Sequence, residues 1–240
     1  DQLRDAVTAA TDESALAGCA LVVEAVAEDR EVKQAVLRRI EAAVPRGALI
    51  ATNTSGLPVS GLAGSLAHPG RFIGLHFFSP VDRMALVEVV VGRETSPATT
   101  EAALAWVRHL GKQPVVVRDS PGFFTSRVFA AYLDEAAAMV GEGVAPERIE
   151  AAAAAAGMSI GPLAMLDETG LALNWQQARQ ARADGLPERF CRPLAWPVLD
   201  RMVNVLGRRG RRDGGGFYDY PAAQFRNLWP GLAQAFPQRA

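Results

Sequence analysis

Apolar residues fall into short runs that alternate with longer amphipathic stretches, a pattern typical of a parallel sheet covered by helices. Residues 21–26 and 48–52 are near-continuous apolar runs, which predict strands buried on both faces. A shorter strand is expected at residues 7–11. Between the two strong runs, a helix is predicted from Asp29, with an apolar face formed by Val32, Val36, Ile40 and Val44. Strand, helix and strand at this spacing predict a βαβ unit with parallel pairing and a right-handed crossover.

Two further strands are predicted at residues 72–78 and 86–91, joined by a turn at Ser79. A helix then begins at Pro97, because Ser96 can cap it. Its apolar face is predicted to contain Leu104, Val107 and Leu110. A last strand is expected at residues 114–117.

The character of the chain changes near residue 119, where we place a domain boundary. Ser120 can cap a long helix that starts at Pro121. The apolar face of this helix is predicted to contain Val128, Tyr132, Ala136 and Met139. Further helices are expected at 146–156, from 161, and at 196–206, and residues 214–220 are expected to form a loop. The sequence therefore predicts an α/β half at 1–119, an all-α half at 120–220 and a tail at 221–240.

Composition and charge exclude several classes of protein. The formal net charge is −1 and 49% of the residues are hydrophobic, so nothing indicates a nucleic-acid partner. No apolar run is long enough to span a bilayer. Cys19 and Cys191 stand alone, which favours reduced thiols and a cytoplasmic location, and no metal-ligand spacing occurs.

Polar residues follow or interrupt the predicted strands where a ligand would bind. Ligands of open parallel sheets gather at the carboxyl ends of the strands. That edge would carry Glu28, Asn53, Ser55 and His76. The alternative is that residues 53–56 are only a turn and that Glu28 is a first-turn helix carboxylate.

His76 and Glu88 interrupt the two strands that the Ser79 turn joins. A carboxylate beside a histidine fixes its ring for proton transfer near neutral pH. The alternative is a half-buried histidine bonded to a backbone carbonyl, with Glu88 facing water. Spacing alone does not choose between the two.

A glycine-rich phosphate turn is absent. No G-x-G-x-x-G follows a predicted strand, so the usual backbone donors for a pyrophosphate are missing from these 240 residues.

The chain resembles the L-3-hydroxyacyl-CoA dehydrogenases of fatty-acid β-oxidation, over about residues 19–220. The matching strings are Val22-Val-Glu-Ala-Val26, Asn53-Thr-Ser55, Gly74-Leu-His-Phe-Phe78, Leu86-Val-Glu-Val89, Asp119-Ser-Pro-Gly-Phe123, Gly161-Pro162 and Gly216-Phe-Tyr218. Around residues 123–143 and after Tyr220 it is similar to bifunctional proteins that fuse a hydratase to this dehydrogenase. The resemblance implies a Rossmann-like parallel sheet and NAD as cofactor.

The resemblance also implies roles for individual residues. His76 would take the 3-hydroxyl proton of an acyl-CoA substrate, Glu88 would hold and polarise the imidazole, and Ser55 would hydrogen-bond the reacting oxygen. Ser126 would lie at the substrate carbonyl region. The cofactor contacts would fall on Val26, Ala27, Glu28, Lys33, Ser55, Ser79 and Arg212. The helical half would associate with a second copy or with further domains of a multifunctional protein.

Some positions depart from the family pattern. The family usually has Asn where Ser126 and Ser79 stand, and Lys where Arg212 stands. Serine has a shorter reach and one donor fewer than asparagine, so we expect a water between Ser126 and the substrate. The family's first strand, glycine-rich turn, helix and second strand would lie upstream of Asp1. We therefore expect an incomplete nucleotide-binding domain, with activity impaired or absent in this chain.

Two rival functions follow from the same residues. A structural or interaction protein could have kept the fold and lost the cofactor site. A β-hydroxyacid or sugar-acid dehydrogenase would instead use a lysine base on a helix, for which the sequence offers no candidate.

Overall fold

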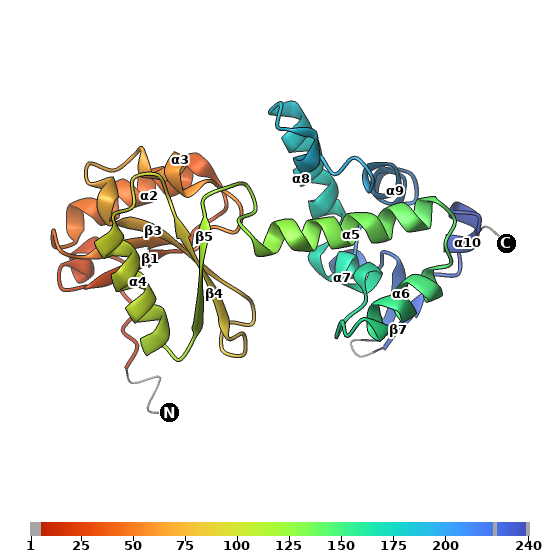
Figure 1. The fold of residues 1–240 in the computed structure, drawn as a ribbon, viewed down its shortest axis with the longest axis horizontal. Helices are drawn as coiled ribbons and strands as arrows, with labels where there is room; N and C mark the ends of the chain where they lie inside the picture. Colours follow the sequence, from red (N-terminus) through yellow and green to blue (C-terminus); the bar gives the residue numbers. More distant parts are fainter. Residues whose placement is uncertain (1–5, 223–224, 239–240) are drawn as a thin grey trace. The chain divides into compact units, whose positions relative to one another are not determined.

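The computed structural model describes residues 6–222 and 225–238. It forms two compact units, residues 1–127 and residues 128–240. The first unit contains a five-stranded sheet in the order β1-β2-β3-β4-β5 (Figure 1). The strands are β1 (Leu21–Glu24), β2 (Leu49–Thr52), β3 (Phe72–Phe77), β4 (Leu86–Val91) and β5 (Gln113–Arg118). The predicted α/β class is confirmed.

Parallel pairing dominates this sheet. β1 pairs parallel with β2, β2 with β3, and β4 with β5, whereas β3 and β4 are antiparallel. The reversal follows from the short connection between β3 and β4, since parallel neighbours need a long crossover. This antiparallel pair sets two polar side chains opposite each other, as described below.

Helices cover both faces of the sheet. They are α2 (Arg30–Ala43), α3 (Val59–Ala63) and α4 (Pro97–His109), with short 3₁₀ turns η1 (Glu13–Leu16) and η2 (Pro69–Arg71). Successive strand residues point to opposite faces. In β2, Ile50 packs with residues of α2 and α3, and its neighbour Ala51 packs with α4. The predicted helices at 29–44 and 97–110 are confirmed.

The expected strand at residues 7–11 is wrong. These residues form no regular element, and Val7 is 76% exposed. Asp12 instead caps η1, where its carboxylate accepts the Ser14 N–H at 2.7 Å. A side chain that caps a helical turn competes with extended backbone at this point.

The prediction that β1 is buried on both faces is also wrong. Val23 is 37% exposed, and of the four strand residues only Glu24 is buried. β1 lies at the edge of the described sheet, so it has one covering neighbour instead of two. By contrast, all four residues of β2 are buried.

The buried faces of two helices are rotated from the prediction. On α2, Val32 is 43% exposed, while Lys33 and Leu37 are buried. A helix has 3.6 residues per turn, so residues spaced by four wind gradually around it. On α4, Leu110 is 52% exposed, and the buried residues are Thr99, Ala103 and Val107.

The long helix after the sheet, α5 (Thr125–Gly141), starts later than predicted. Gly122 and Phe123 have positive φ angles of 73° and 48°, which break any helix begun at Pro121. Val128, predicted on the apolar face, is 54% exposed. The buried residues of α5 are Leu133, Asp134, Ala136, Ala137 and Val140.

The second unit packs its helices around one core. These are α6 (Pro146–Ala155), α7 (Pro162–Thr169), α8 (Leu171–Ala183), η3 (Glu188–Phe190), α9 (Trp196–Asp200), a π-helical turn η4 (Arg201–Val205), η5 (Arg211–Asp213) and α10 (Leu232–Ala235). The prediction that no strand follows residue 119 is wrong. β6 (Tyr218–Ala222) and β7 (Phe225–Leu228) form an antiparallel pair.

One buried carboxylate holds this hairpin. Asp167 on α7 accepts the N–H groups of Phe217 and Tyr218 at 2.8 and 2.9 Å and the Tyr220 hydroxyl at 3.0 Å. A Cβ at Gly216 would lie 1.9 Å from Asp167 Oδ1, so this position requires glycine. Burial raises the pKa of the Asp167 carboxyl to about 6, although its hydrogen bonds oppose the rise.

Candidate active site

His76 and Glu88 form a buried pair on neighbouring strands. The antiparallel register of β3 and β4 sets them directly opposite each other, so their side chains share one face of the sheet. His76 Nδ1 lies 2.7 Å from Glu88 Oε2. The prediction that the two side chains are within hydrogen-bonding reach is confirmed. Glu88 is 0% exposed, which rules out the alternative in which it faces water.

The start of α5 supplies the other partners of Glu88. Its Oε1 accepts the N–H groups of Phe124 at 3.0 Å and Thr125 at 2.8 Å, and its Oε2 accepts the Thr125 hydroxyl at 2.9 Å. Burial alone would raise the pKa of the Glu88 carboxyl. The hydrogen bonds from His76, Thr125 and Phe124 together outweigh it and hold this pKa below its usual value.

Aromatic rings enclose the imidazole of His76. The ring of Phe78 has its centre 4.4 Å from that of the imidazole, and the ring of Phe123 lies at 5.8 Å. Phe123 is 1% exposed and has a positive φ. Aromatic walls exclude water and lower the local dielectric constant, so they strengthen the His76–Glu88 interaction.

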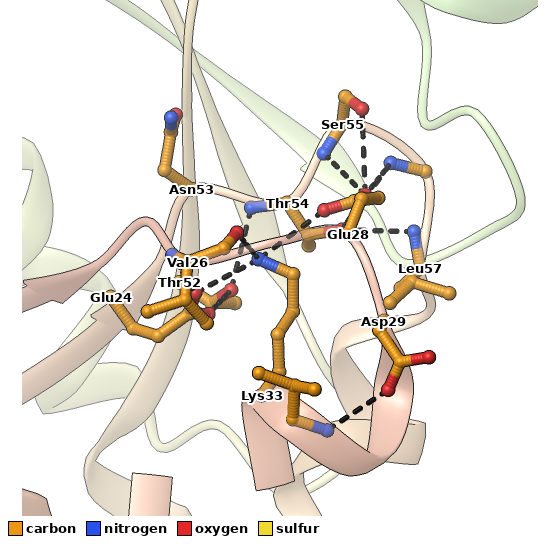
Figure 2. Close-up of polar contacts among 12 residues, drawn as sticks. Glu24, Val26, Glu28, Asp29, Lys33, Thr52, Asn53, Thr54, Ser55 and Leu57 are labelled. Carbon is orange, nitrogen blue, oxygen red and sulfur yellow. Dashed lines mark hydrogen bonds and ion pairs between the residues drawn. The ribbon is translucent and has the colours of Figure 1, made fainter. Parts of the chain in front are cut away.

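A second group of polar residues lies at the carboxyl ends of β1 and β2 (Figure 2). We call Glu24, Lys33, Glu28, Thr52 and Thr54 the Lys33 cluster. Lys33 Nζ lies 2.9 Å from Glu24 Oε1, 3.2 Å from the Val26 carbonyl oxygen and 3.2 Å from Glu28 Oε2. An ammonium has three donors, and all three are used here. Lys33 is 1% exposed, so its charge is balanced inside the protein.

Glu28 connects the Lys33 cluster to the loop that follows β2. Its Oε1 accepts the N–H groups of Ser55 at 3.0 Å and Gly56 at 3.2 Å, as well as the Thr54 hydroxyl. Burial would raise the pKa of the Glu28 carboxyl, but the bonds from Thr54, Lys33 and Ser55 keep it below its usual value. The side chain is 42% exposed. Glu28 precedes α2, whose cap is Asp29, so it is not a first-turn helix residue.

The two polar groups are linked through Asn53. Its Oδ1 accepts the N–H of Phe77 at 2.9 Å, which ties the end of β2 to the end of β3. Residues 53–56 do form a turn, since Thr54 Oγ1 accepts the N–H of Leu57 at 2.9 Å. The same turn also directs the N–H groups of Ser55 and Gly56 at Glu28, so the turn is confirmed and the ligand-binding role stays a prediction.

The remaining residues named from the sequence are placed as follows. Ser55, Val26, Ala27 and Ser79 are exposed. Ser55 Oγ lies 3.4 Å from Glu28 Oε1, and Ser126, the second residue of α5, is half-buried. Arg212 is exposed in η5 of the second unit. The roles assigned to these residues stay predictions.

Two residues of the site, Glu24 and Thr125, were missed from the sequence, and the burial of a third, Lys33, was not predicted. Glu24 interrupts the apolar run of β1 just as His76 interrupts that of β3, so this signal was present. Lys33 was expected to contact the cofactor, but its position on the buried face of α2 was not foreseen. Thr125 gave no signal, because its contact depends on the positive φ of Phe123.

Comparison with known proteins identifies the family. The NAD-binding domain of 3-hydroxyacyl-CoA dehydrogenase matches residues 1–120, and the C-terminal domain of the same enzyme matches residues 122–220. The chain belongs to the 3-hydroxyacyl-CoA dehydrogenase family. The predicted family, the enzyme class and NAD as its cofactor are confirmed.

Individual relatives agree with this assignment. The fatty acid oxidation complex subunit alpha of Shewanella oneidensis is 37% identical over 223 residues, which cover 93% of this chain and 31% of that protein. The chain therefore spans about a third of the length of the curated relatives it matches.

Solved structures of 3-hydroxyacyl-CoA dehydrogenases share the fold. The (S)-3-hydroxybutyryl-CoA dehydrogenase of Ralstonia eutropha is 34% identical, with a TM-score of 0.82 over 89% of this chain and 75% of that chain. The 3-hydroxybutyryl-CoA dehydrogenase of Escherichia coli is 37% identical, with a TM-score of 0.81 over 90% of this chain and 46% of that chain.

Two further classes of site are absent from the described residues. Within residues 6–222 and 225–238, no group of three or more His, Cys, Asp or Glu side chains could hold a metal ion. No helix in the same part of the chain is long and apolar enough to cross a membrane.

Proposed function

We propose that this chain carries the proton-transfer site for NAD-dependent oxidation of an L-3-hydroxyacyl-CoA to the 3-oxoacyl-CoA. The observation that supports it most strongly is the His76–Glu88 pair, buried and 2.7 Å apart. A histidine held by an ionised carboxylate is a general base suited to neutral pH. Family membership gives this base its substrate class.

The contacts of Glu88 determine which nitrogen of His76 acts. Its low pKa makes Glu88 an ionised, acceptor-only group, so Nδ1 of His76 must donate to it. The other nitrogen, Nε2, is then an acceptor, and no described residue occupies it. Nε2 is therefore the atom that takes the proton of the 3-hydroxyl group.

The residues at the ends of β1 and β2 fit the ribose side of a nicotinamide nucleotide. Among the described residues, Glu28 Oε2 bonds to Lys33 alone, and the Glu28 side chain is 42% exposed, so this oxygen can accept a hydroxyl hydrogen. Ser55, beside it, has an exposed hydroxyl that can reach the reacting oxygen. Lys33 fixes Glu28 through the ion pair between its Nζ and Glu28 Oε2. NAD, when bound, supplies the hydride acceptor.

The domain boundary, the partners and the location belong to the same proposal. We keep residue 119 as the boundary between the nucleotide-binding and helical domains, and the two family matches meet near there, at 120 and 122. We propose association with further domains, since the Shewanella oneidensis relative is subunit alpha of a fatty acid oxidation complex. Free thiols at Cys19 and Cys191 agree with a reducing, cytoplasmic location.

A second candidate function is a protein that kept the fold and does not turn over substrate. It is favoured by the absence of a G-x-G-x-x-G turn from the 240 residues. We expect the chain alone to bind NAD no better than millimolar, or about 4 kcal/mol at most, and to show no turnover. NADH titration by fluorescence, beside an assay with acetoacetyl-CoA, measures both. Micromolar binding with turnover would contradict this expectation.

A fusion distinguishes the two functions. A strand–turn–helix segment that carries a G-x-G-x-x-G turn would be placed before residue 1. We expect the fused protein to reduce acetoacetyl-CoA, and His76→Ala to lower kcat by about a hundredfold or more. A fused protein that binds NADH without turnover, or whose activity survives His76→Ala, refutes the proposed function.

A further inference from the structure

The carboxylate of Glu88 is saturated with hydrogen-bond donors. An ionised carboxylate offers about four lone-pair sites. Two backbone N–H groups lie 2.8 and 3.0 Å from Oε1. The Thr125 hydroxyl lies 2.9 Å from Oε2, and His76 Nδ1 lies 2.7 Å from the same oxygen. Glu88 is 0% exposed, so water does not compete for these sites. Each donor therefore bears directly on how Glu88 holds the imidazole.

Thr125 differs from the other donors because it is a side chain that shares an oxygen with His76. The two backbone N–H groups on Oε1 are provided by any residue at these positions. The hydroxyl on Oε2 is provided only by threonine or serine. Thr125 is the first residue of α5, and its branched Cβ restricts rotation about χ1. Its hydroxyl is thus held at the oxygen that faces the catalytic ring.

We propose that Thr125 is a positioning residue of the dyad, whose hydroxyl fixes Glu88 Oε2 against His76 Nδ1 and keeps the carboxylate an acceptor only. The contact is read from the structure, and its catalytic consequence rests on the proposed function. Loss of the hydroxyl leaves a buried lone pair on Oε2 without a partner. Glu88 then becomes more basic and bonds His76 more strongly.

The surroundings of Glu88 make this effect measurable. Among the described residues, its contacts come from His76 on β3 and from Phe124 and Thr125 at the start of α5. β5 places Val115, which carries no charge, opposite Glu88 in the sheet. His76 is thus the one titratable side chain that contacts it in the described part of the chain. A change at Thr125 acts on the dyad without disturbing another charge.

The test uses the 240-residue chain and needs no turnover. Thr125→Val keeps the branched shape and removes the hydroxyl, whereas Thr125→Ser keeps the hydroxyl. Thr100→Val on α4 is the matched control, because in the described part of the chain the Thr100 hydroxyl bonds only the Ser96 carbonyl. Carbon-13 NMR follows the titration of Glu88. Nitrogen-15 NMR reports the proton position on His76, with the exposed His68 and His109 as internal standards.

We expect Thr125→Val to raise the pKa of Glu88 by about one unit and to move the Nδ1–H resonance of His76 downfield. Thr125→Ser and Thr100→Val should leave both signals at their wild-type positions. An unchanged Glu88 titration in folded Thr125→Val overturns the proposal. If Thr125→Val does not fold, Thr125→Ala replaces it.

The nitrogen-15 spectrum of the wild-type chain tests the proposal independently of the variants. A proton on Nε2 of His76 at neutral pH overturns the proposal, whatever the variants do, and a proton on Nδ1 supports it. Failure of this proposal can also be distinguished from failure of the proposed function. A chain that shows the expected titrations but whose fusion never turns over substrate refutes the function and leaves the role of Thr125 standing.

Discussion

Replacing Glu88 by glutamine tests how the dyad works, because the structure dictates which way the new amide must point. The two backbone N–H groups that meet Oε1 cannot move without unwinding the start of α5. The amide oxygen must therefore take the place of Oε1, and the NH₂ group must take the place of Oε2. That NH₂ group faces Nδ1 of His76, which becomes an acceptor, and the imidazole proton moves to Nε2.

The expected loss follows from two effects. Keeping the proton on Nδ1 would leave two donors facing each other in a buried site, at a cost of about 1–3 kcal/mol. This reduces the reactive tautomer by about 5–150-fold. Loss of the charge removes a hydrogen bond to an ionised group, about 1.5–3 kcal/mol for the imidazolium formed during the reaction. Together, Glu88→Gln should lower kcat of the fused protein by about 10²–10⁴.

Two measurements check this reasoning. Acetoacetyl-CoA reduction gives kcat, and nitrogen-15 NMR shows which ring nitrogen of His76 carries the proton. Glu41→Gln on α2 is the control, since Glu41 also accepts two backbone N–H groups, from Ala67 and His68, away from the dyad. A Glu88→Gln protein that keeps the Nδ1 proton and loses less than about fivefold in kcat refutes the argument.

Three further outcomes are expected. Ser126→Asn in the fused protein should be neutral or mildly beneficial for kcat, because a water fills the gap to the substrate oxygen; a collapse in activity at unchanged stability would show a pocket built around serine. Lys33→Met should lower the free energy of unfolding by about 3–5 kcal/mol in urea titrations, since it leaves Glu24 buried without its cation. Adding Glu24→Gln to this variant should recover part of the lost stability. A loss below about 1 kcal/mol for Lys33→Met contradicts this expectation. Because the folded pKa of Asp167 is raised to about 6 from 3.8, the folded state binds the proton more tightly, so protonation stabilises it. The free energy of unfolding relative to Asp167→Asn should therefore rise by up to about 3 kcal/mol from pH 7 to pH 4; a flat or falling difference would refute the assignment.

The dyad was predicted from the spacing of His76 and Glu88 together with the family resemblance, because spacing alone left two readings open. β3 and β4 are buried along almost their whole length, so a change of register would disturb the packing on both faces of the sheet. The short link between β3 and β4 then leaves His76 and Glu88 opposite each other. The convergence of Glu28 and Asn53 at one edge of the sheet follows in the same way from parallel strand order.

What the sequence could not show depends on tertiary placement. Lys33 lies on the buried face of α2, because contacts with the core determine which face of the helix is buried. The spacing of apolar residues by four does not determine it. β1 has the composition of a central strand, yet its position at the edge of the described sheet leaves Val23 exposed. β6 and β7 were missed because Asp167, 50 residues away from Phe217, holds them in place.

The two polar groups of the first unit follow one design, which explains why their supporting residues matter. The first network fills the acceptor sites of Glu88 and the second uses the three donors of Lys33. Each holds one atom that can meet a ligand, Nε2 of His76 in the first and Oε2 of Glu28 in the second. Glu88 and Lys33 are themselves buried and fully bonded, so neither has an alternative partner to which it can turn. The available atom is therefore held in position before any ligand arrives, and that preorganisation is what a proton acceptor requires. We therefore propose that Thr125 and Lys33 act on the reaction through the atoms they hold, without touching the substrate.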